Sequence, residues 1–277
     1  MPSTSATGSD EVPISQLGRF KILQVLGCGG QSMALKAWDT ELFRHVVIKV
    51  RHSFDSQAEQ ERMLFEGRAL ARVRHANVCK CLSVEWLGDF PYLVLQYIPG
   101  ETLRERILRR RLTLPESVEL SLTLCEAVAA IHDSGLLHCD LKPSNIVVND
   151  TNEPTVVDLG LATSRLELTP AHTMGTPAYL APERANGEIE LIDERCDVFG
   201  IGAVLYELLT GQAPFAHQTS EGSRRLAREG IVRPATCGCS ELQEVLMRSL
   251  ARQPSDRFRD AREFRLALMK FDTRPAN

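Results

Sequence analysis

Hydrophobic residues occur in short, strand-like runs through residues 20–98. Most runs are rich in Val, Ile, Leu and aromatic residues and are bounded by turn residues, as expected for strands that bury one face. One stretch among them, SQAEQERMLFEGRALARVR (56–74), places apolar residues at helical spacing. We therefore predict a small sheet that carries one helix. The predicted strands are FKILQVLG (20–27), MALKAWD (33–39), HVVIKV (45–50), VCKCLSVEWLG (78–88) and PYLVLQYI (91–98).

Helical patterns dominate the chain after residue 98. The junction YIPGET (97–102) carries Pro and Gly, as a hinge between two lobes would. Two short strands, IVVND (146–150) and PTVVDLG (154–160), interrupt the helices. The predicted class is α+β with two lobes, a small β-rich one over about 17–98 and a larger helical one over about 99–272. The predicted helices are LPESVELSLTLCEAVAAIHDSG (114–135), CDVFGIGAVLYELLTG (196–211), SELQEVLMRSLARQ (240–253) and DAREFRLALMKF (260–271).

Composition limits the cell compartment and the kinds of partner. The chain has 277 residues, 43% of them hydrophobic, and a formal net charge of −4, so it can bury a core but has no overall attraction to nucleic acid or anionic membranes. Residues 1–16 are rich in small polar residues, which predicts a disordered tail without a signal peptide; residues 273–277 form a second short tail. No apolar run approaches the roughly 20 residues of a membrane span. We expect a cytoplasmic protein with no nucleic-acid or membrane partner.

Eight cysteines are spread along the chain, mostly inside hydrophobic segments. A cytoplasmic domain of this size does not need disulfides, so we expect reduced thiols. The pairs Cys79/Cys81 and Cys237/Cys239 have a spacing that structural zinc sites do not favour. We interpret them as packing residues.

The segment HCDLKPSN (138–145) gathers an acid, a cation and an amide in one loop, because Pro143 prevents a helix there. Asp140 is spaced to accept a proton from a hydroxyl, and Lys142 to neutralise a phosphate. Asn145 can offer an amide oxygen to a hard cation, and Asp158, at the end of the strand VVDLG, a second oxygen.

Two features of the first lobe have weaker meaning when taken alone. Gly27, Gly29 and Gly30 lie between two predicted strands, where bare backbone can approach an anion; a hairpin without a ligand is equally consistent. Lys49 stands in an apolar strand, where it either reaches water or points into a cleft at a partner. Glu66, on the predicted helix, could be that partner.

The ordered series of motifs resembles the protein-kinase superfamily, and most closely the bacterial serine/threonine kinases of eukaryotic type. The resemblance covers about residues 18–271 and implies a bilobal protein-kinase-like fold. Lys142, and Thr176 in GTPAYLAPE, match the serine/threonine subgroup. The motifs are GCGG (27–30), VVIK (46–49), Glu66, HCDLKPSN (138–145), DLG (158–160), GTPAYLAPE (175–183) and DVFGIG (197–202).

The resemblance implies an ATP- and Mg²⁺-dependent protein kinase, with Mn²⁺ as an alternative ion. Lys49 would contact the α- and β-phosphates, and Glu66 would orient it. Asp140 would act as the catalytic base or position the substrate hydroxyl, and Lys142 would steady the γ-phosphate. Asn145 and Asp158 would hold the metal ions. The remaining ATP-binding residues would be the phosphate loop Gly27, Cys28, Gly29 and Gly30, and, around adenine, Leu26, Ala34, Val47, Gln96, Ile98 and Val147, behind gatekeeper Leu95.

The same resemblance assigns two scaffold contacts and the partners. Glu183 would pair with Arg257, and Asp197 would brace the loop HCDLKPSN (138–145), called the catalytic loop below. Protein substrates with Ser or Thr acceptors are implied, and the chain itself could be one of them by autophosphorylation.

The chain departs from the family pattern at four positions. Ser32 and Val47 add bulk near ATP, and Leu159 replaces a phenylalanine. In many relatives an arginine at the position of Cys139 pairs with a phosphorylated activation-loop residue, and a cysteine has neither the charge nor the reach to do so. We therefore expect activity that does not depend on that contact, although Thr163, Ser164, Thr169 and Thr173 remain candidate phosphosites.

Two alternatives remain open on the sequence. A pseudokinase would keep the fold without transferring phosphate, but the site residues Lys49, Glu66, Asp140, Asn145 and Asp158 are all present. A small-molecule kinase of the same fold would lack the GTPAYLAPE segment, which in protein kinases shapes the peptide platform.

Overall fold

The computed structural model describes residues 15–28, 32–52, 57–164, 167–169, 173–235 and 238–272. The chain forms two compact units, the first made of residues 1–67 and 80–97 and the second of residues 68–79 and 98–277. Most of the expected tails, residues 1–14 and 273–277, lie outside the described residues, whereas Gln16 is described and belongs to a strand. None of the helices in the described part of the chain has the length and apolar character of a membrane span.

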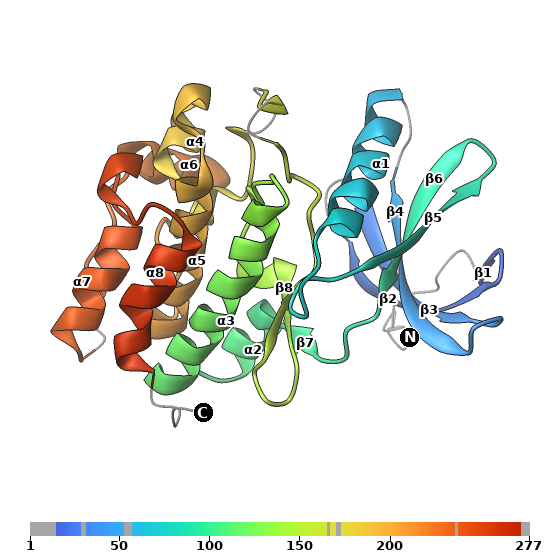
Figure 1. Ribbon diagram of the computed structural model, residues 1–277, viewed down its shortest axis with the longest axis horizontal. Helices are drawn as coiled ribbons and strands as arrows, with labels where there is room; N and C mark the ends of the chain where they lie inside the picture. The colour runs from blue at the N-terminus through green and yellow to red at the C-terminus, as the bar shows by residue number, and fades with distance from the viewer. Residues whose placement is uncertain are drawn as a thin grey trace, which may run out of the picture. The chain divides into compact units, whose positions relative to one another are not determined.

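The first unit is an antiparallel sheet with one helix, as predicted (Figure 1). Its strands follow the order β1-β2-β3-β4-β6-β5. The helix α1 (Gln57–Arg72) connects β4 to β5 in the chain. The strands are β1 (Gln16–Leu17), β2 (Phe20–Cys28), β3 (Ser32–Asp39), β4 (Arg44–Arg51), β5 (Cys81–Leu87) and β6 (Phe90–Gln96).

The two faces of this sheet have different compositions, because successive side chains of a strand point to opposite sides. One face holds a core of buried residues that includes Leu35, Ile48 and Val94. The pairing of Ala34 with Lys49 and of Val47 with Leu95 places these four residues on the other face. Register therefore separates the residues that stabilise the sheet from those assigned to ATP.

The second unit is mainly helical (Figure 1). Its helix α3 contacts α5 and α8, and a small sheet of order β7-β8-β9 lies beside α2 and α3. The elements are β7 (Glu101–Thr102), α2 (Leu103–Arg109), α3 (Leu114–Asp133), β8 (Ile146–Val148), β9 (Pro154–Val156), α4 (Pro182–Asn186), α5 (Glu194–Thr210), α6 (Ser220–Glu229), α7 (Ser240–Ser249) and α8 (Ala261–Leu268).

Two of the differences between the structure and the sequence predictions have a clear physical cause. Residues 68–79, expected in the first lobe, group with the second unit. The cause is local pairing, because the N–H of Cys79 donates to the carbonyl of Val156 and the guanidinium of Arg72 donates to the carbonyl of Ser134. Helix α6 was not predicted, since it buries only Ser223 and Ala227 and so has almost no apolar stripe.

A buried ion pair joins α4 to the loop that follows α7, as the sequence predicted. Both carboxylate oxygens of Glu183 accept from the guanidinium of Arg257, at 2.8 and 2.7 Å. The two side chains are 1% and 0% exposed, so neither charge is solvated by water. Arg257 also donates to the carbonyl of Arg195 at the start of α5, which ties three segments together.

Replacing Arg257 by Met should lower the free energy of unfolding by about 3–5 kcal/mol, because it leaves the Glu183 carboxylate buried and unpaired. Urea unfolding followed by circular dichroism measures this loss. Arg259→Met is the matched control, because Arg259 is 77% exposed and its pair with Asp260 should contribute less than about 1 kcal/mol. Equal losses in the two variants would contradict the assignment.

Candidate active site

Lys49 and Glu66 form the ion pair that the sequence suggested. Nζ of Lys49 lies 2.7 Å from Oε1 of Glu66, and the two side chains are 11% and 6% exposed. Strand β4 presents Lys49 on the sheet face opposite the core, and α1 supplies Glu66. The carboxylate offsets the cost of holding an ammonium inside the protein and fixes its position. This pair therefore fixes the position of the Lys49 ammonium within the first unit.

The residues assigned to adenine and phosphate are placed only in part. Ala34 and Val47 share the face that carries Lys49, and Leu26 is partly exposed on β2. Gly27 and Cys28 end β2, whereas Gly29 and Gly30 lie outside the described residues. The backbone N–H of Gln96 donates to the carbonyl of Lys80, so it is not the group that would bind adenine. Ile98 and Val147 belong to the second unit, and their assignment to ATP stays a prediction.

Asp140, Lys142 and Asn145 converge in the loop that precedes β8. Nζ of Lys142 lies 2.6 Å from one oxygen of Asp140 and 2.7 Å from Oγ1 of Thr176. The amide nitrogen of Asn145 donates to the same carboxylate at 3.1 Å. Thr176 approaches the other oxygen through its backbone N–H, at 3.3 Å. The carboxylate of Asp140 is therefore oriented from three sides by residues of two separate segments.

Asn145 and Asp158 are brought together by the pairing of β8 with β9. Ile146 pairs with Val156, and the N–H of Val157 donates to the carbonyl of Asn145. The amide nitrogen of Asn145 is used by Asp140, which leaves its amide oxygen for a cation. One carboxylate oxygen of Asp158 accepts from the N–H of Gly160. This pair of oxygen donors fits a hard divalent ion such as Mg²⁺.

Asp197, at the start of α5, braces the catalytic loop as predicted. Its carboxylate accepts from the backbone N–H groups of His138 and Cys139, at 2.7 and 2.9 Å, and lies 2.9 Å from Nε2 of His132. Burial alone would raise the pKa of Asp197, but the hydrogen bonds from His132 and from the backbone of His138 outweigh it and hold the pKa below its usual value. The carboxylate stays ionised at neutral pH.

His138 has a positioning role that sequence reasoning did not assign. Burial lowers the pKa of this imidazole despite the neighbouring carboxylates, so the ring is neutral at neutral pH. Its Nδ1 accepts from the backbone N–H of Asp140 at 3.1 Å. The histidine therefore fixes the backbone that carries Asp140.

A groove of about 510 Å³ opens beside Lys142 and Thr176. Inside it, the buried carboxylate of Glu207 accepts from Arg104 at 2.7 Å and from the hydroxyl of Tyr179 at 2.6 Å. Burial and the charge of Glu207 raise the pKa of Tyr179, which keeps this hydroxyl a donor. The sequence motifs did not predict this network, because Arg104 and Glu207 lie far apart in the chain.

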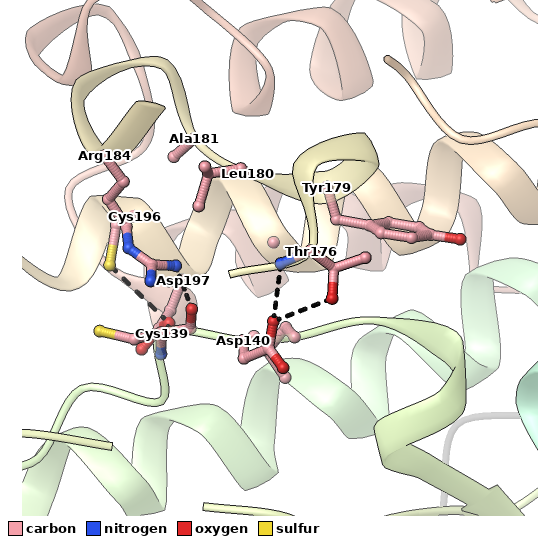
Figure 2. Close-up of a pocket in the computed structure, with 11 residues that line it drawn as sticks. Cys139, Asp140, Thr176, Tyr179, Leu180, Ala181, Arg184, Cys196 and Asp197 are labelled. Atoms are coloured by element: carbon pink, nitrogen blue, oxygen red, sulfur yellow. Dashed lines mark hydrogen bonds between the residues drawn. The ribbon is translucent and has the colours of Figure 1, made fainter. Parts of the chain in front are cut away.

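A small cavity beside the catalytic loop is lined by Cys139, Cys196 and Asp197 (Figure 2). Their donor atoms lie within 4.8 Å of one another, which is the spacing of a metal site. However, both oxygens of Asp197 already accept backbone hydrogen bonds, and Cys196 has a pKa well above its usual value because of the hydrogen bond with Cys139 and burial. Protonated thiols are poor ligands, so we assign no metal here.

Among the described cysteines of the two C-x-C pairs, only Cys79 and Cys81 lie in the packed surroundings that were predicted. Cys79 is buried, and burial together with the charge of Glu66 raises the pKa of Cys81 to about 11. Cys239 is partly exposed, and Cys237 lies outside the described residues.

Comparison with known proteins identifies the family. The protein kinase domain family matches residues 20–266. A probable serine/threonine-protein kinase of Clostridium acetobutylicum is 31% identical over 88% of this chain and 38% of its own length. Serine/threonine-protein kinase PknB of Mycobacterium leprae is 31% identical over 91% of this chain and 43% of its own. The chain thus spans about two fifths of these curated relatives. With Lys49–Glu66, Asp140 and Asp197 in the arrangement described above, the chain belongs to the protein kinase domain family.

Proposed function

We propose that this chain is a serine/threonine protein kinase that transfers the γ-phosphate of ATP to Ser or Thr hydroxyls of proteins. The observation that carries the proposal is the carboxylate of Asp140, which is held by Lys142, Asn145 and Thr176 beside an open groove. In phosphoryl transfer the protein mainly positions groups and stabilises charge, and this arrangement can do both.

Each site residue has a distinct part in this proposal. Asp140 accepts the proton of the substrate hydroxyl and aims its oxygen at the γ-phosphate. Lys142, already 2.6 Å from Asp140, balances negative charge where the two substrates meet. Lys49, oriented by Glu66, binds the α- and β-phosphates. When bound, Mg²⁺ neutralises charge on the phosphates, and the oxygens of Asn145 and Asp158 hold it, with Mn²⁺ as an alternative ion.

The geometry of the site also argues against the two alternative functions, a pseudokinase and a small-molecule kinase. A pseudokinase is not favoured, because the cation pair and the carboxylate arrangement are both intact. A small-molecule kinase is not favoured either, because the groove is lined in part by Thr176, Ala178 and Tyr179 of the GTPAYLAPE segment. The groove suits a peptide segment, which supports protein substrates. Autophosphorylation and a cytoplasmic location stay predictions.

Replacing Asp140 by Asn should lower kcat for protein phosphorylation by about 10²–10⁴-fold, because the amide cannot accept the hydroxyl proton. The Kd for ATP should stay close to that of the wild type, since Asp140 contacts the acceptor. Steady-state kinetics with a generic protein acceptor and a separate nucleotide-binding titration measure the two quantities. A variant that retained wild-type kcat would remove Asp140 from the catalytic role.

Replacing Lys49 by Met should lower kcat about 10²–10³-fold and raise KM for ATP, since one positioned donor to the phosphates is lost. Lys36→Met is the matched control, because Lys36 lies on the same sheet face and bonds the hydroxyl of Tyr97 at 3.1 Å. The control should keep both kinetic constants. If both variants lost activity equally, the effect would be one of sheet stability and not of phosphate binding.

A further inference from the structure

The segment from Asp158 to Glu183 is called the activation loop below, and among its described residues Met174, like Thr176, is attached to the catalytic loop. Met174 is attached through Arg184, which follows Glu183 in α4. Figure 2 shows the guanidinium of Arg184 above Cys139 and Asp197.

The guanidinium of Arg184 bridges two backbone carbonyls. One nitrogen donates to the carbonyl of Cys139 in the catalytic loop, and the other to the carbonyl of Met174 in the activation loop. Arg184 is only 4% exposed, so these hydrogen bonds replace its hydration. A planar guanidinium can serve two acceptors from two segments at once, whereas an ammonium has no such fixed fork.

These contacts close a ring around Asp140. Arg184 holds the carbonyl of Cys139, and Cys139 precedes Asp140. Asp140 accepts from Thr176, and Gly175 joins Thr176 to Met174, which Arg184 also holds. Displacement of either segment would therefore break a hydrogen bond of a buried charged group, which costs more than a neutral one.

The backbone of Cys139 depends on the same ring. Its φ is +65°, in the left-handed region that a residue with a side chain rarely adopts. Such a conformation costs of order 1–3 kcal/mol and persists only where surrounding contacts hold it. Here the N–H of Cys139 is held by Asp197 and its carbonyl by Arg184. The two contacts together fix the peptide that positions Asp140.

We propose that Arg184 is a positioning residue that holds the activation loop on the catalytic loop without a phosphate. The proposal about Arg184 rests on the proposed kinase function, and it concerns how the active site of that kinase is regulated. An arginine at position 139 would need a phosphorylated partner to join these two segments, whereas Arg184 supplies a guanidinium from α4 and uses a backbone carbonyl as its partner. The segments are joined in the unmodified chain, so loop phosphorylation is not required for activity.

The test compares phosphatase-treated wild type, Arg184→Met and Arg184→Lys, each confirmed free of phosphate by mass spectrometry. The treated wild type should keep its kcat. Arg184→Met should lose about 100-fold in kcat, the cost of a small misplacement of reacting groups, with KM for ATP unchanged. Arg184→Lys should fall between the two, because an ammonium cannot hold both carbonyls in one geometry. Arg228→Met is the matched control, since Arg228 donates to the carbonyl of Ala185 outside the ring and should change neither constant.

Two further readouts distinguish positioning from folding. Millimolar methylguanidine should restore part of the kcat of Arg184→Ala, which a misfolded protein would not allow. Amide hydrogen exchange of the peptide around Met174 should be slow in the treated wild type and faster in Arg184→Met. Loss of kcat on dephosphorylation, wild-type kcat in Arg184→Met or Arg184→Lys, or unchanged exchange would each overturn the proposal. A wild type that transfers no phosphate would instead overturn the kinase function, while the exchange comparison would still test the attachment.

Discussion

The carboxylate of Asp197 is the contact on which the catalytic loop depends. A buried anion is costly unless every side of it is hydrogen-bonded, and the backbone N–H groups of His138 and Cys139 supply that stabilisation. The reverse also holds, because two successive N–H groups aimed at one carboxylate fix the left-handed turn at Cys139. Asp140 follows that turn directly, so the direction of its side chain is set by helix α5 as well as by its own loop.

In the first unit, the ammonium of Lys49 is also held by a partner from another element, in this case the carboxylate of Glu66. The sheet buries its core on one face, and strand register leaves Lys49 on the other, where Glu66 of α1 pairs with it. A one-residue slip of β4 would exchange Lys49 with the buried Ile48. Sheet stability and the position of the phosphate-binding cation are therefore properties of the same register.

Much of the candidate active site could be predicted from the sequence, because its residues belong to short sequence motifs. Lys49, Glu66, Asp140 and Asp197 each match an element of the family pattern, and the Lys49–Glu66 pair and the bracing contact of Asp197 followed from the resemblance. The groups that hold Glu207 and Met174 could not be predicted in this way. Arg104 and Arg184 look like ordinary helical arginines in the sequence, and only the tertiary structure brings them to Glu207 and to the carbonyl of Met174. Helix α6 was missed for a similar reason, since its polar sequence carries almost no apolar stripe.

The most direct test of the central claim is the identity of the phosphorylated product. Purified wild-type protein would be incubated with γ-labelled ATP, Mg²⁺ and a generic protein acceptor, and the labelled residues would be mapped by mass spectrometry. The account predicts label on serine and threonine side chains, because Lys142 and Thr176, which match the serine/threonine subgroup, contact each other at 2.7 Å at the edge of the groove. Absence of protein-bound label, with ATP binding intact, would contradict it.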